Sequence, residues 1–326
     1  MSISRRLNYY RRIAAAYLTS TPSHLTFWHE KPEADPRASA SELGAYYMAF
    51  RSKADYHAHL DPEDIPQLDY RGAIGLQYNP IAIAQYGLGN FNLYLAANDQ
   101  QRLRRAILVA DWLVANLERN NSGFAVWNHH FDWEYRDRLR APWQSALAQG
   151  QGISLLVRAH AATKQPKYLE AALAAFEPML HSVAEGGVQY VDAAGDVWLE
   201  EYVVDPPTHI LNGFVWALWG LHDLYLASGD RRAAMLEKAC TATLRRNLAR
   251  YDCGFWSLYE LAGTALPMLA SPFYHALHIV QLDVMHKLTG DDCFAAAAKR
   301  WGAYRRRRFN RSRAVVQKSI FKLCYY

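Results

Sequence analysis

The sequence predicts a mainly α-helical protein, an incomplete (α/α) toroid of helical hairpins with small β-hairpins at the mouth of a central cleft. Four apolar segments that each contain one amide side chain recur at spacings of 64, 63 and 69 residues, and each continues as a helix. Repetition at a near-constant period is typical of stacked structural units. The alternative is coincidence in a chain rich in Ala and Leu, which the regular spacing disfavours. The amides are Gln85, Gln149, Asn212 and Gln281.

The composition agrees with a large folded core. The chain has 326 residues, of which 51% are hydrophobic and 13% are aromatic, and this excludes a disordered chain. The 10 Trp and 21 Tyr residues either fill a helical core or stack on the flat faces of sugars. Composition alone favours the first interpretation.

The chain divides into three parts in sequence order. Residues 1–77 are expected to form a basic helix followed by an extended arm, in which the prolines of residues 61–66 predict a loop. Residues 78–308 are expected to form the (α/α) barrel, and residues 309–326 a basic tail.

Within the barrel, each amide-containing helix is expected to pair with a second helix, at about 101–116, 167–180 and 231–248. The second helices would surround the inner ones, and the amides would point their polar ends into the cleft. Glycines beside the amides, such as Gly150 and Gly213, permit close approach of another backbone or of a substrate.

The loops between these units predict β-hairpins at residues 120–143 and 186–202, since apolar and polar residues alternate around glycine-containing turns. The second hairpin would deliver residues 200–202 to the start of the third inner helix. Residues 251–259 are expected to play the same part before the fourth.

Charge is distributed unevenly along the chain. The net charge is +5, but residues 1–20 carry +4 and residues 300–326 carry +9, which leaves the middle at −8. A basic end either binds an anionic polymer or membrane surface, or is simply solvated. Nucleic acid is not the expected partner, because no recognition motif accompanies the basic residues and the acidic body would repel phosphate.

The cysteines form no CxxC pair and no zinc spacing, which is typical of reduced thiols in a cytosolic protein. They are Cys240, Cys253, Cys293 and Cys324. We find no signal peptide and no apolar run of membrane-spanning length. The expected location is therefore the cytoplasm.

Glu200, Glu201 and Tyr202 are the first candidate site. Paired carboxylates suit acid and base chemistry because close like charges raise one pKa. On an extended strand Glu200 and Tyr202 would share one face and Glu201 the other, but a strand end can break this pattern. The sequence thus leaves open which glutamate faces the cleft, or whether the pair is merely solvated.

Tyr274, His275 and His278 form the second candidate site, directly after Ser271-Pro272, a plausible helix start. Tyr274 and His278 would share a helix face. Two histidines without an HExxH pattern or an evident third ligand do not predict a metal site; hydrogen bonding in a cleft or core is expected instead. The sequence also contains no Rossmann, P-loop or GxSxG motif.

Several motifs together resemble the D-glucuronyl C5-epimerase family over about residues 78–308. They occur in the family's order at residues 80–88 (PIAIAQYGL), 111–116 (DWLVAN), 148–159 (AQGQGISLLVRA), 198–202 (WLEEY), 211–214 (LNGF), 251–259, 274–282 (YHALHIVQL) and 299–301 (KRW).

The resemblance implies an (α/α) toroid that converts D-glucuronate to L-iduronate within heparosan or heparan sulfate-type glycosaminoglycan chains, without a cofactor. It implies Glu201 and Tyr274 as the catalytic pair on opposite faces of the sugar, and Tyr202 and Tyr259 as further functional tyrosines. The expected partner is an acidic polysaccharide, and a homodimer is possible. The candidate substrate-binding residues are Glu200, His275, His278, Asn212, Gln85, Tyr86, Gln149, Gln151 and Arg158.

The chain departs from the animal members of this family in two places. They carry a large β-rich region where only 22 residues separate Leu88 from Asp111 here, and an Arg-Trp-Asp segment where residues 269–273 stand. The uronan and the oligomeric state therefore stay open. Three alternative functions remain: a polysaccharide lyase, a glycoside hydrolase using Glu200 or Glu201 with Asp205, and a glycan-binding protein without catalysis.

Overall fold

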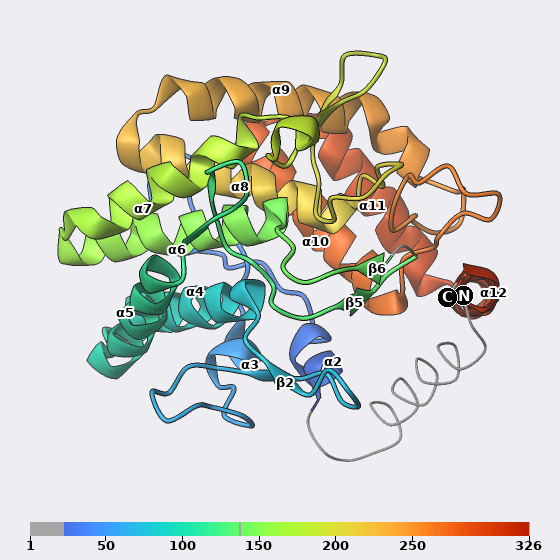
Figure 1. Cartoon of the computed structure of the whole chain (residues 1–326). Helices are drawn as coiled ribbons and strands as arrows, with labels where there is room; N and C mark the ends of the chain where they lie inside the picture. Colours follow the sequence, from blue (N-terminus) through green and yellow to red (C-terminus); the bar gives the residue numbers. More distant parts are fainter. Residues whose placement is uncertain (1–22, 137, 326) are drawn as a thin grey trace.

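The computed structural model describes residues 23–136 and 138–325. The basic helix predicted within residues 1–20 lies outside this range. In the described residues four helical hairpins dominate, as predicted, and the fold is of the (α/α)-toroid type. Figure 1 shows α5, α7 and α9 along the outside of the molecule.

The inner helices contact one another in chain order, each 18 residues long: α4 (Pro80–Ala97), α6 (Ala146–Thr163), α8 (Leu211–Ser228) and α10 (Pro272–Thr289). Each packs against its outer partner. These partners are α5 (Gln100–Ala115), α7 (Pro166–Phe176), α9 (Arg231–Asn247) and α11 (Asp292–Arg306).

The helical hairpins repeat along the chain, but the four amides stand at different positions within their helices. The inner helices begin 66, 65 and 61 residues apart, whereas the amides stand at their sixth, fourth, second and tenth positions. The repeating unit is thus the helical hairpin, and the expectation that all four amides point into the cleft is wrong, as described below.

Burial distinguishes the two layers. The inner helices α4, α6 and α8 are buried on every face over their first three turns, so that every residue from Leu211 to Leu224 of α8 is buried. The outer helices bury one stripe, such as Ala233, Leu236, Cys240 and Leu244 of α9, and expose the rest. Asp99, Asp230 and Asp291 cap the first turns of three outer helices.

Two glycines set the closest helix crossing. A Cβ on Gly150 of α6 would lie 2.5 Å from the Cα of Ala217, and a Cβ on Gly220 of α8 would lie 2.5 Å from the Cα of Gly150. Only glycine permits this approach of the two backbones. The contact joins Gly150, the fifth residue of α6, to the segment from Trp216 to Gly220 of α8.

Short antiparallel hairpins join the helices. The segment 120–143 contributes two of them, and the segment 186–202 forms the hairpin predicted there, with Gln189 opposite Leu199. Residues 251–259 form a turn of 3-10 helix and isolated bridges instead of a hairpin. The strands are β1 (Leu68–Asp69), β2 (Leu76–Gln77), β3 (Glu118–Arg119), β4 (Ala125–Val126), β5 (Trp133–Glu134), β6 (Arg138–Leu139), β7 (Gln189–Val191) and β8 (Val197–Leu199). The 3-10 helices are η1 (Glu177–Met179), η2 (Val183–Glu185) and η3 (Leu248–Tyr251).

Both ends of the described chain pack on the barrel. The arm carries α2 (His24–Trp28) and α3 (Arg51–Ala54), and α3 lies on α4. The basic tail is a helix, α12 (Arg308–Tyr325), which contacts α10 and α11 and buries Ala314 and Phe321. No helix among the described residues is long and apolar enough to cross a membrane.

Candidate active site

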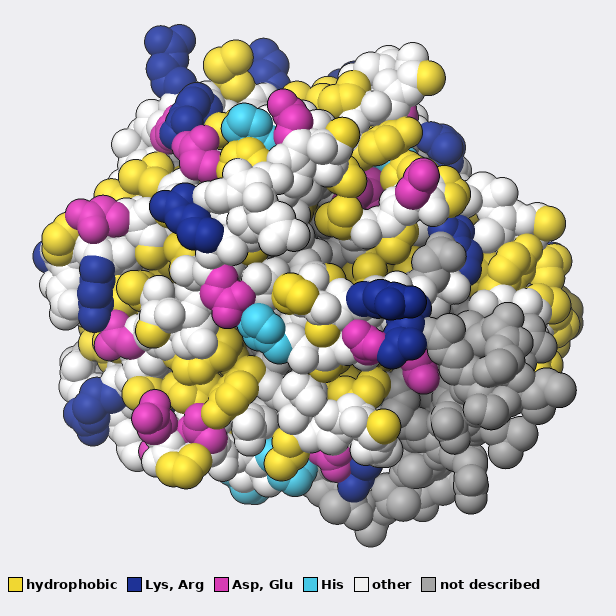
Figure 2. Space-filling view, viewed as in Figure 1, with side chains coloured by type: hydrophobic (Ala, Val, Ile, Leu, Met, Phe, Trp, Pro, Cys, Tyr) yellow, Lys and Arg dark blue, Asp and Glu magenta, His cyan; other side chains and the backbone are white. Residues whose placement is uncertain are grey.

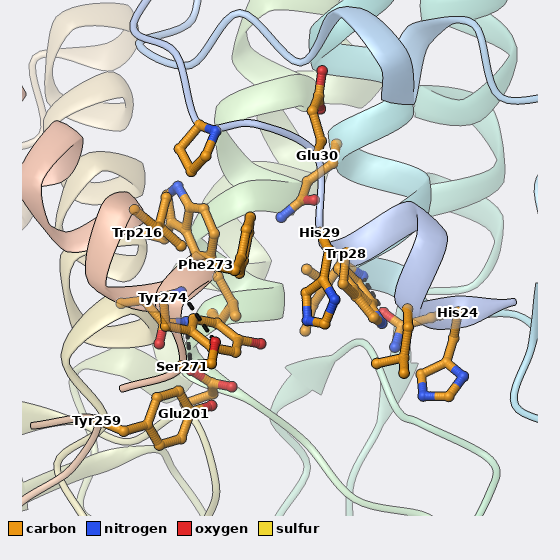
Figure 3. A pocket seen from close by; sticks show the side chains of 18 of the residues that line it. His24, Trp28, His29, Glu30, Glu201, Trp216, Tyr259, Ser271, Phe273 and Tyr274 are labelled. Atoms are coloured by element: carbon orange, nitrogen blue, oxygen red, sulfur yellow. Dashed lines mark hydrogen bonds between the residues drawn. The ribbon is translucent and has the colours of Figure 1, made fainter. Parts of the chain in front are cut away.

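A cavity of about 230 Å³ is lined by the N-terminal turns of α8 and α10, the arm, the β5–β6 hairpin and α12. Figure 3 shows two of its walls, with Glu201, Tyr259 and Tyr274 on one side and His24, Trp28 and His29 on the other. Much of the remaining lining is aromatic and includes Trp133, Trp143, Trp216 and Phe273. Flat rings of this kind suit the faces of sugar rings.

Glu201 is placed by the end of β8. The strand stops at Leu199, the chain bends, and the Glu201 side chain turns into the cavity with only 5% exposure. Its Oε2 accepts a hydrogen bond from Nδ2 of Asn212 at 3.2 Å. Gly213 lies against it, and a side chain there would overlap the carboxylate.

Burial raises the pKa of Glu201 to about 8. Hydrogen bonds from Tyr202 and Asn212 lower it, and the negative charges of Glu260 and Glu200 raise it, but both influences are smaller than burial. A carboxyl group whose pKa lies near neutrality is poised to take up or release a proton.

Several tyrosines line the cavity with Glu201, among them Tyr274 and Tyr259. Tyr274 lies in the first turn of α10, and its backbone N–H donates to Oγ of the N-cap Ser271 at 3.2 Å. The ring of Tyr259 meets the ring of Tyr274 at 4.9 Å between centroids. Burial raises the pKa of Tyr259 well above its ordinary value, and the charge of Glu201 raises it further. Tyr259 is therefore a neutral hydroxyl.

Tyr202 and Tyr135 extend this cluster. Their ring centroids are 4.8 Å apart, and Tyr202 also meets Trp143 edge-on at 5.7 Å. The Tyr135 hydroxyl donates to the buried carboxylate of Glu260. Sequence reasoning noted the aromatic segment around Tyr135 as a cleft-mouth hairpin but did not select Tyr135 itself.

Basic side chains that the sequence analysis did not select line the cavity. They are His24 and His29 of the arm, Lys31, Lys53, and Lys318 and Lys322 of α12. Burial lowers the pKa of Lys53 and of Lys318 to about 7. Burial and the charges of Lys53, Lys318 and Lys322 lower the pKa of His29 to about 4. The basic charge of the C-terminal residues was the only sequence signal for any of them.

Glu200 takes a different place from Glu201. Its carboxylate accepts hydrogen bonds from the backbone N–H of His209, at 3.1 Å, and from the His209 ring, and it does not line the cavity. The sequence left open which glutamate faces the cleft. In the structure Glu201 lines the cavity and Glu200 does not, and β8 ends before both residues. Glu200 fixes the loop that leads into α8.

Of the predicted amides, Gln85 and Asn212 line the cavity, and Gln149 and Gln281 do not. Gln149 clamps backbone groups: its amide nitrogen donates to the carbonyls of Ala125 and Ala175, and its oxygen accepts from Trp127 N–H. Gln281 donates to the carbonyl of Asn212 at 2.9 Å. Both amides thus satisfy buried backbone groups.

Gln151, Tyr86 and Arg158 also lie outside the cavity lining. The oxygen of Gln151 accepts from Nε2 of Gln85 at 2.9 Å, so Gln151 orients a residue that does line it. Arg158 is buried and forms a 2.6 Å ion pair with Asp223. The structure gives Arg158 a position inside the barrel wall.

His275 and His278 lie behind the cavity wall. Oγ of Ser257 is 2.8 Å from Nδ1 of His275 and 3.0 Å from Nδ1 of His278. Burial lowers the pKa of His275 to about 4 and holds the pKa of His278 well below its ordinary value. The described residues contain no group of three His, Cys, Asp or Glu side chains able to hold a metal ion. Both imidazoles instead fix Ser257, two residues before Tyr259.

Comparisons with known proteins show which family the chain resembles. A family model described as D-glucuronyl C5-epimerase C-terminus matches residues 120–303. The D-glucuronyl C5-epimerase of Caenorhabditis elegans is 33% identical over 210 residues, which cover 60% of this chain and 34% of that protein. An uncharacterised protein of Methanocaldococcus jannaschii is 26% identical over 244 residues, 70% of this chain and 78% of that protein.

Solved structures share the fold. A D-mannose isomerase superposes with a TM-score of 0.52 at 12% identity, over 78% of this chain and 67% of that one. The cellobiose 2-epimerase from Spirochaeta thermophila superposes with a TM-score of 0.51 at 12% identity, over 92% and 84% of the two chains. At this identity the likeness concerns the fold alone.

Proposed function

Because the chain belongs to the D-glucuronyl C5-epimerase family, whose model matches more than half of it, we propose that it inverts C5 of D-glucuronate to L-iduronate within heparosan or heparan-type chains. The matched segment spans about a third of the C. elegans enzyme, so the activity is argued from this chain's own cavity. The observation that carries the proposal is the buried Glu201 carboxyl, with a pKa raised to about 8, in a cavity that Tyr202, Tyr259 and Tyr274 also line.

The chemistry requires a base of this kind. The hydrogen on C5 is weakly acidic because it is adjacent to the uronate carboxylate, and its removal places further negative charge on that group. Glu201 in its carboxylate form takes the C5 proton, and its raised pKa makes it a stronger base than a solvated glutamate. Asn212 holds the carboxylate in position through its 3.2 Å hydrogen bond.

Inversion requires a proton donor on the other face of the sugar, because a single group returning its own proton restores the starting sugar. Tyr274 is the proposed donor, and its ionised oxygen then regains a proton from solvent. The neutral hydroxyls of Tyr259 and Tyr202 are proposed to hydrogen-bond the charged intermediate. The 4.9 Å contact between the Tyr259 and Tyr274 rings supports their acting on the same atoms.

The test is proton NMR of N-acetylated and N-sulfated heparosan incubated with the protein in deuterated water. We expect deuterium at C5 together with iduronate signals, and a rate reduced roughly a hundredfold or more in Glu201→Gln and in Tyr274→Phe. Glu200→Gln is the matched comparison, expected to retain exchange in whatever fraction folds, because Glu200 does not line the cavity.

Two outcomes would replace the proposal. Unsaturated uronate signals would assign the same tyrosine and carboxylate cluster to a lyase, which starts from the same proton removal and then expels the C4 oxygen. New reducing ends would assign a hydrolase. If the wild-type protein bound both polymers but exchanged no C5 hydrogen on either, the result would assign a glycan-binding protein without catalysis.

A further inference from the structure

Helix α12 lies beyond the family-matched residues 120–303, yet it forms part of the cavity wall. Ala314 and Phe321 are each 1% exposed and anchor the helix on the barrel. Lys318 is four residues after one anchor and three before the other, so it lies on the same inward face. Figure 1 shows α12 at one edge of the molecule, where the described chain ends.

The ammonium group of Lys318 lies next to the tyrosine cluster. Its Nζ is 5.3 Å from the centroid of the Tyr259 ring and donates a 2.8 Å hydrogen bond to the carbonyl of Leu269. Tyr259 in turn meets Tyr274 at 4.9 Å. The ammonium group therefore lies against the ring of Tyr259, which in turn contacts the ring of Tyr274.

The charges around Lys318 favour an anionic ligand. Lys322 of the same helix, His29 and Lys53 of the arm all interact electrostatically with this region, and Glu260 is the acidic group that faces Lys318. The lowered pKa of Lys318 reflects an ammonium group removed from water beside another cation. A carboxylate entering the cavity would compensate this cost.

We propose that Lys318 binds the carboxylate of the uronate in the cavity, so that α12 supplies the positive charge against which the C5 intermediate forms. This rests on the proposed function for the identity of the ligand. A cation at this carboxylate stabilises the intermediate more than the substrate, because negative charge accumulates on the carboxylate oxygens when the C5 proton leaves.

Lys53 is a buried lysine of the same cavity, whereas Lys318 is half-buried, and Lys53 is less suited to this role. Its Nζ donates to the carbonyl of Phe27 at 2.7 Å and lies 4.2 Å from the centroid of the Phe27 ring. These contacts place the Lys53 ammonium group within the arm. The Lys318 ammonium group is the one placed against Tyr259.

The experiment compares two ligands, a heparosan oligosaccharide and the same oligosaccharide with its carboxylates reduced to alcohols. Calorimetry measures the affinity of each for wild type, Lys318→Gln, Lys318→Met and Arg311→Gln. Glutamine keeps an N–H donor for the carbonyl of Leu269, and Arg311 is an exposed cation on the same helix. A thermal melt of each variant checks folding.

Removal of the Lys318 charge is expected to weaken binding of the uronate oligosaccharide about tenfold to a hundredfold, which is the size of a charge-assisted hydrogen bond. Binding of the reduced oligosaccharide is expected to stay within about twofold, and Arg311→Gln is expected to change neither. An equal loss for both ligands, or no loss for the uronate, in a folded Lys318 variant would overturn the proposal.

The C5 exchange assay separates this inference from the proposed function. Carboxylate-dependent binding through Lys318 without exchange in the wild type would overturn the epimerase and keep the carboxylate site. If the wild type exchanged C5 hydrogen but the Lys318 variants bound the uronate oligosaccharide as tightly as the wild type, the epimerase would stand and the role of α12 would be overturned.

Discussion

Glu200 and Glu201 are neighbours with opposite surroundings. The Glu200 carboxylate accepts hydrogen bonds from His209, whereas the Glu201 carboxyl is buried in the cavity beside Asn212. This difference arises because β8 ends at Leu199 and the following residues bend. The sequence contained the pair but not the bend, so it left open which glutamate faces the cavity.

The raised pKa of Glu201 predicts a dependence of stability on pH. Its folded pKa of about 8 lies above the ordinary 4.5, so its contribution to stability is complete below about pH 4.5 and is lost as pH rises towards 8. Glu201→Gln imitates the protonated acid and lacks this loss. Across that window the variant should gain on the wild type by on the order of 4 kcal/mol.

Denaturant unfolding of both proteins at several pH values measures this difference. A constant difference between pH 4.5 and 8 would mean that Glu201 is solvated and titrates normally. Glu33→Gln, at an exposed ion pair, is the control and should show little change.

Gly213 predicts a second residue-scale effect, on activity. A Cβ there would overlap the Glu201 carboxylate, so Gly213→Ala should displace the base and lower the C5 exchange rate roughly a hundredfold. Gly302→Ala is the control, because the nearest atom to a Cβ there is the flexible end of Arg306 at 3.8 Å. Full activity of Gly213→Ala would contradict the proposed role of Glu201.

At the scale of elements, α6 and α8 pack with their backbones in close contact. The crossing depends on Gly150 and Gly220, which let the two backbones touch. Gly220→Ala should destabilise the protein by about 1–3 kcal/mol through overpacking, whereas Gly302→Ala should be neutral or slightly stabilising. Chemical denaturation measures the free energy of unfolding of both variants. If Gly220→Ala were as stable as Gly302→Ala, α6 and α8 would be able to move apart at little cost.

The segment before Tyr259 depends on a buried polar network. Ser257 Oγ lies within 3.0 Å of two imidazoles, His275 and His278. Ser257→Ala would remove the side-chain partner of His278 Nδ1, whereas His275 would keep the backbone N–H of residue 257 and the carbonyl of Trp301. We expect a loss of about 1–3 kcal/mol in the free energy of unfolding, measured by denaturant titration.

We also expect the C5 exchange activity to survive dialysis against a chelator. Loss of activity after dialysis would instead assign the two histidines to a metal site.

At the scale of the whole molecule, a buried ion pair joins the arm to the barrel. Arg158 and Asp223 pair at 2.6 Å, Arg158 Nε donates to the carbonyl of Gly44, and the Tyr47 hydroxyl donates to Asp223 at 2.8 Å. The arm that forms one cavity wall is thereby fixed against α6 and α8. Arg158, which the sequence analysis selected as a substrate-binding residue, therefore holds the arm and the helices together and does not line the cavity.

Removal of one partner should be costly, because the other charge stays buried. Asp223→Asn is expected to destabilise the protein by about 3–5 kcal/mol, a large part of the stability of an ordinary domain. Thermal and denaturant unfolding measure the loss. A change below about 1 kcal/mol would show that water reaches Arg158 in the folded state.

Surface charge is also a property of the whole molecule. On the face shown in Figure 2, basic and acidic side chains are interspersed among the described residues. The sequence analysis expected the basic C-terminal residues either to bind an anion or to be solvated. The structure turns two of these side chains, Lys318 and Lys322, towards the cavity.

The sequence by itself determined the helical repeat and the hairpin at residues 186–202, because these are local patterns of hydrophobicity. The family resemblance selected Glu201, Tyr202, Tyr259 and Tyr274, and all four line the cavity. Spacing alone misplaced the amides, since helix starts and amides follow different periods.

Only the tertiary structure decided which polar residues line the cavity. Lys53, Tyr135 and Lys318 come from separate parts of the chain and meet in one cavity lining. Three residues of the family-like motifs do not line the cavity and bind buried partners instead. They are His275 and His278, which contact Ser257, and Arg158, which pairs with Asp223. The physical reason is that burial and pairing depend on contacts between distant elements, and no local pattern records which face of each helix those contacts cover.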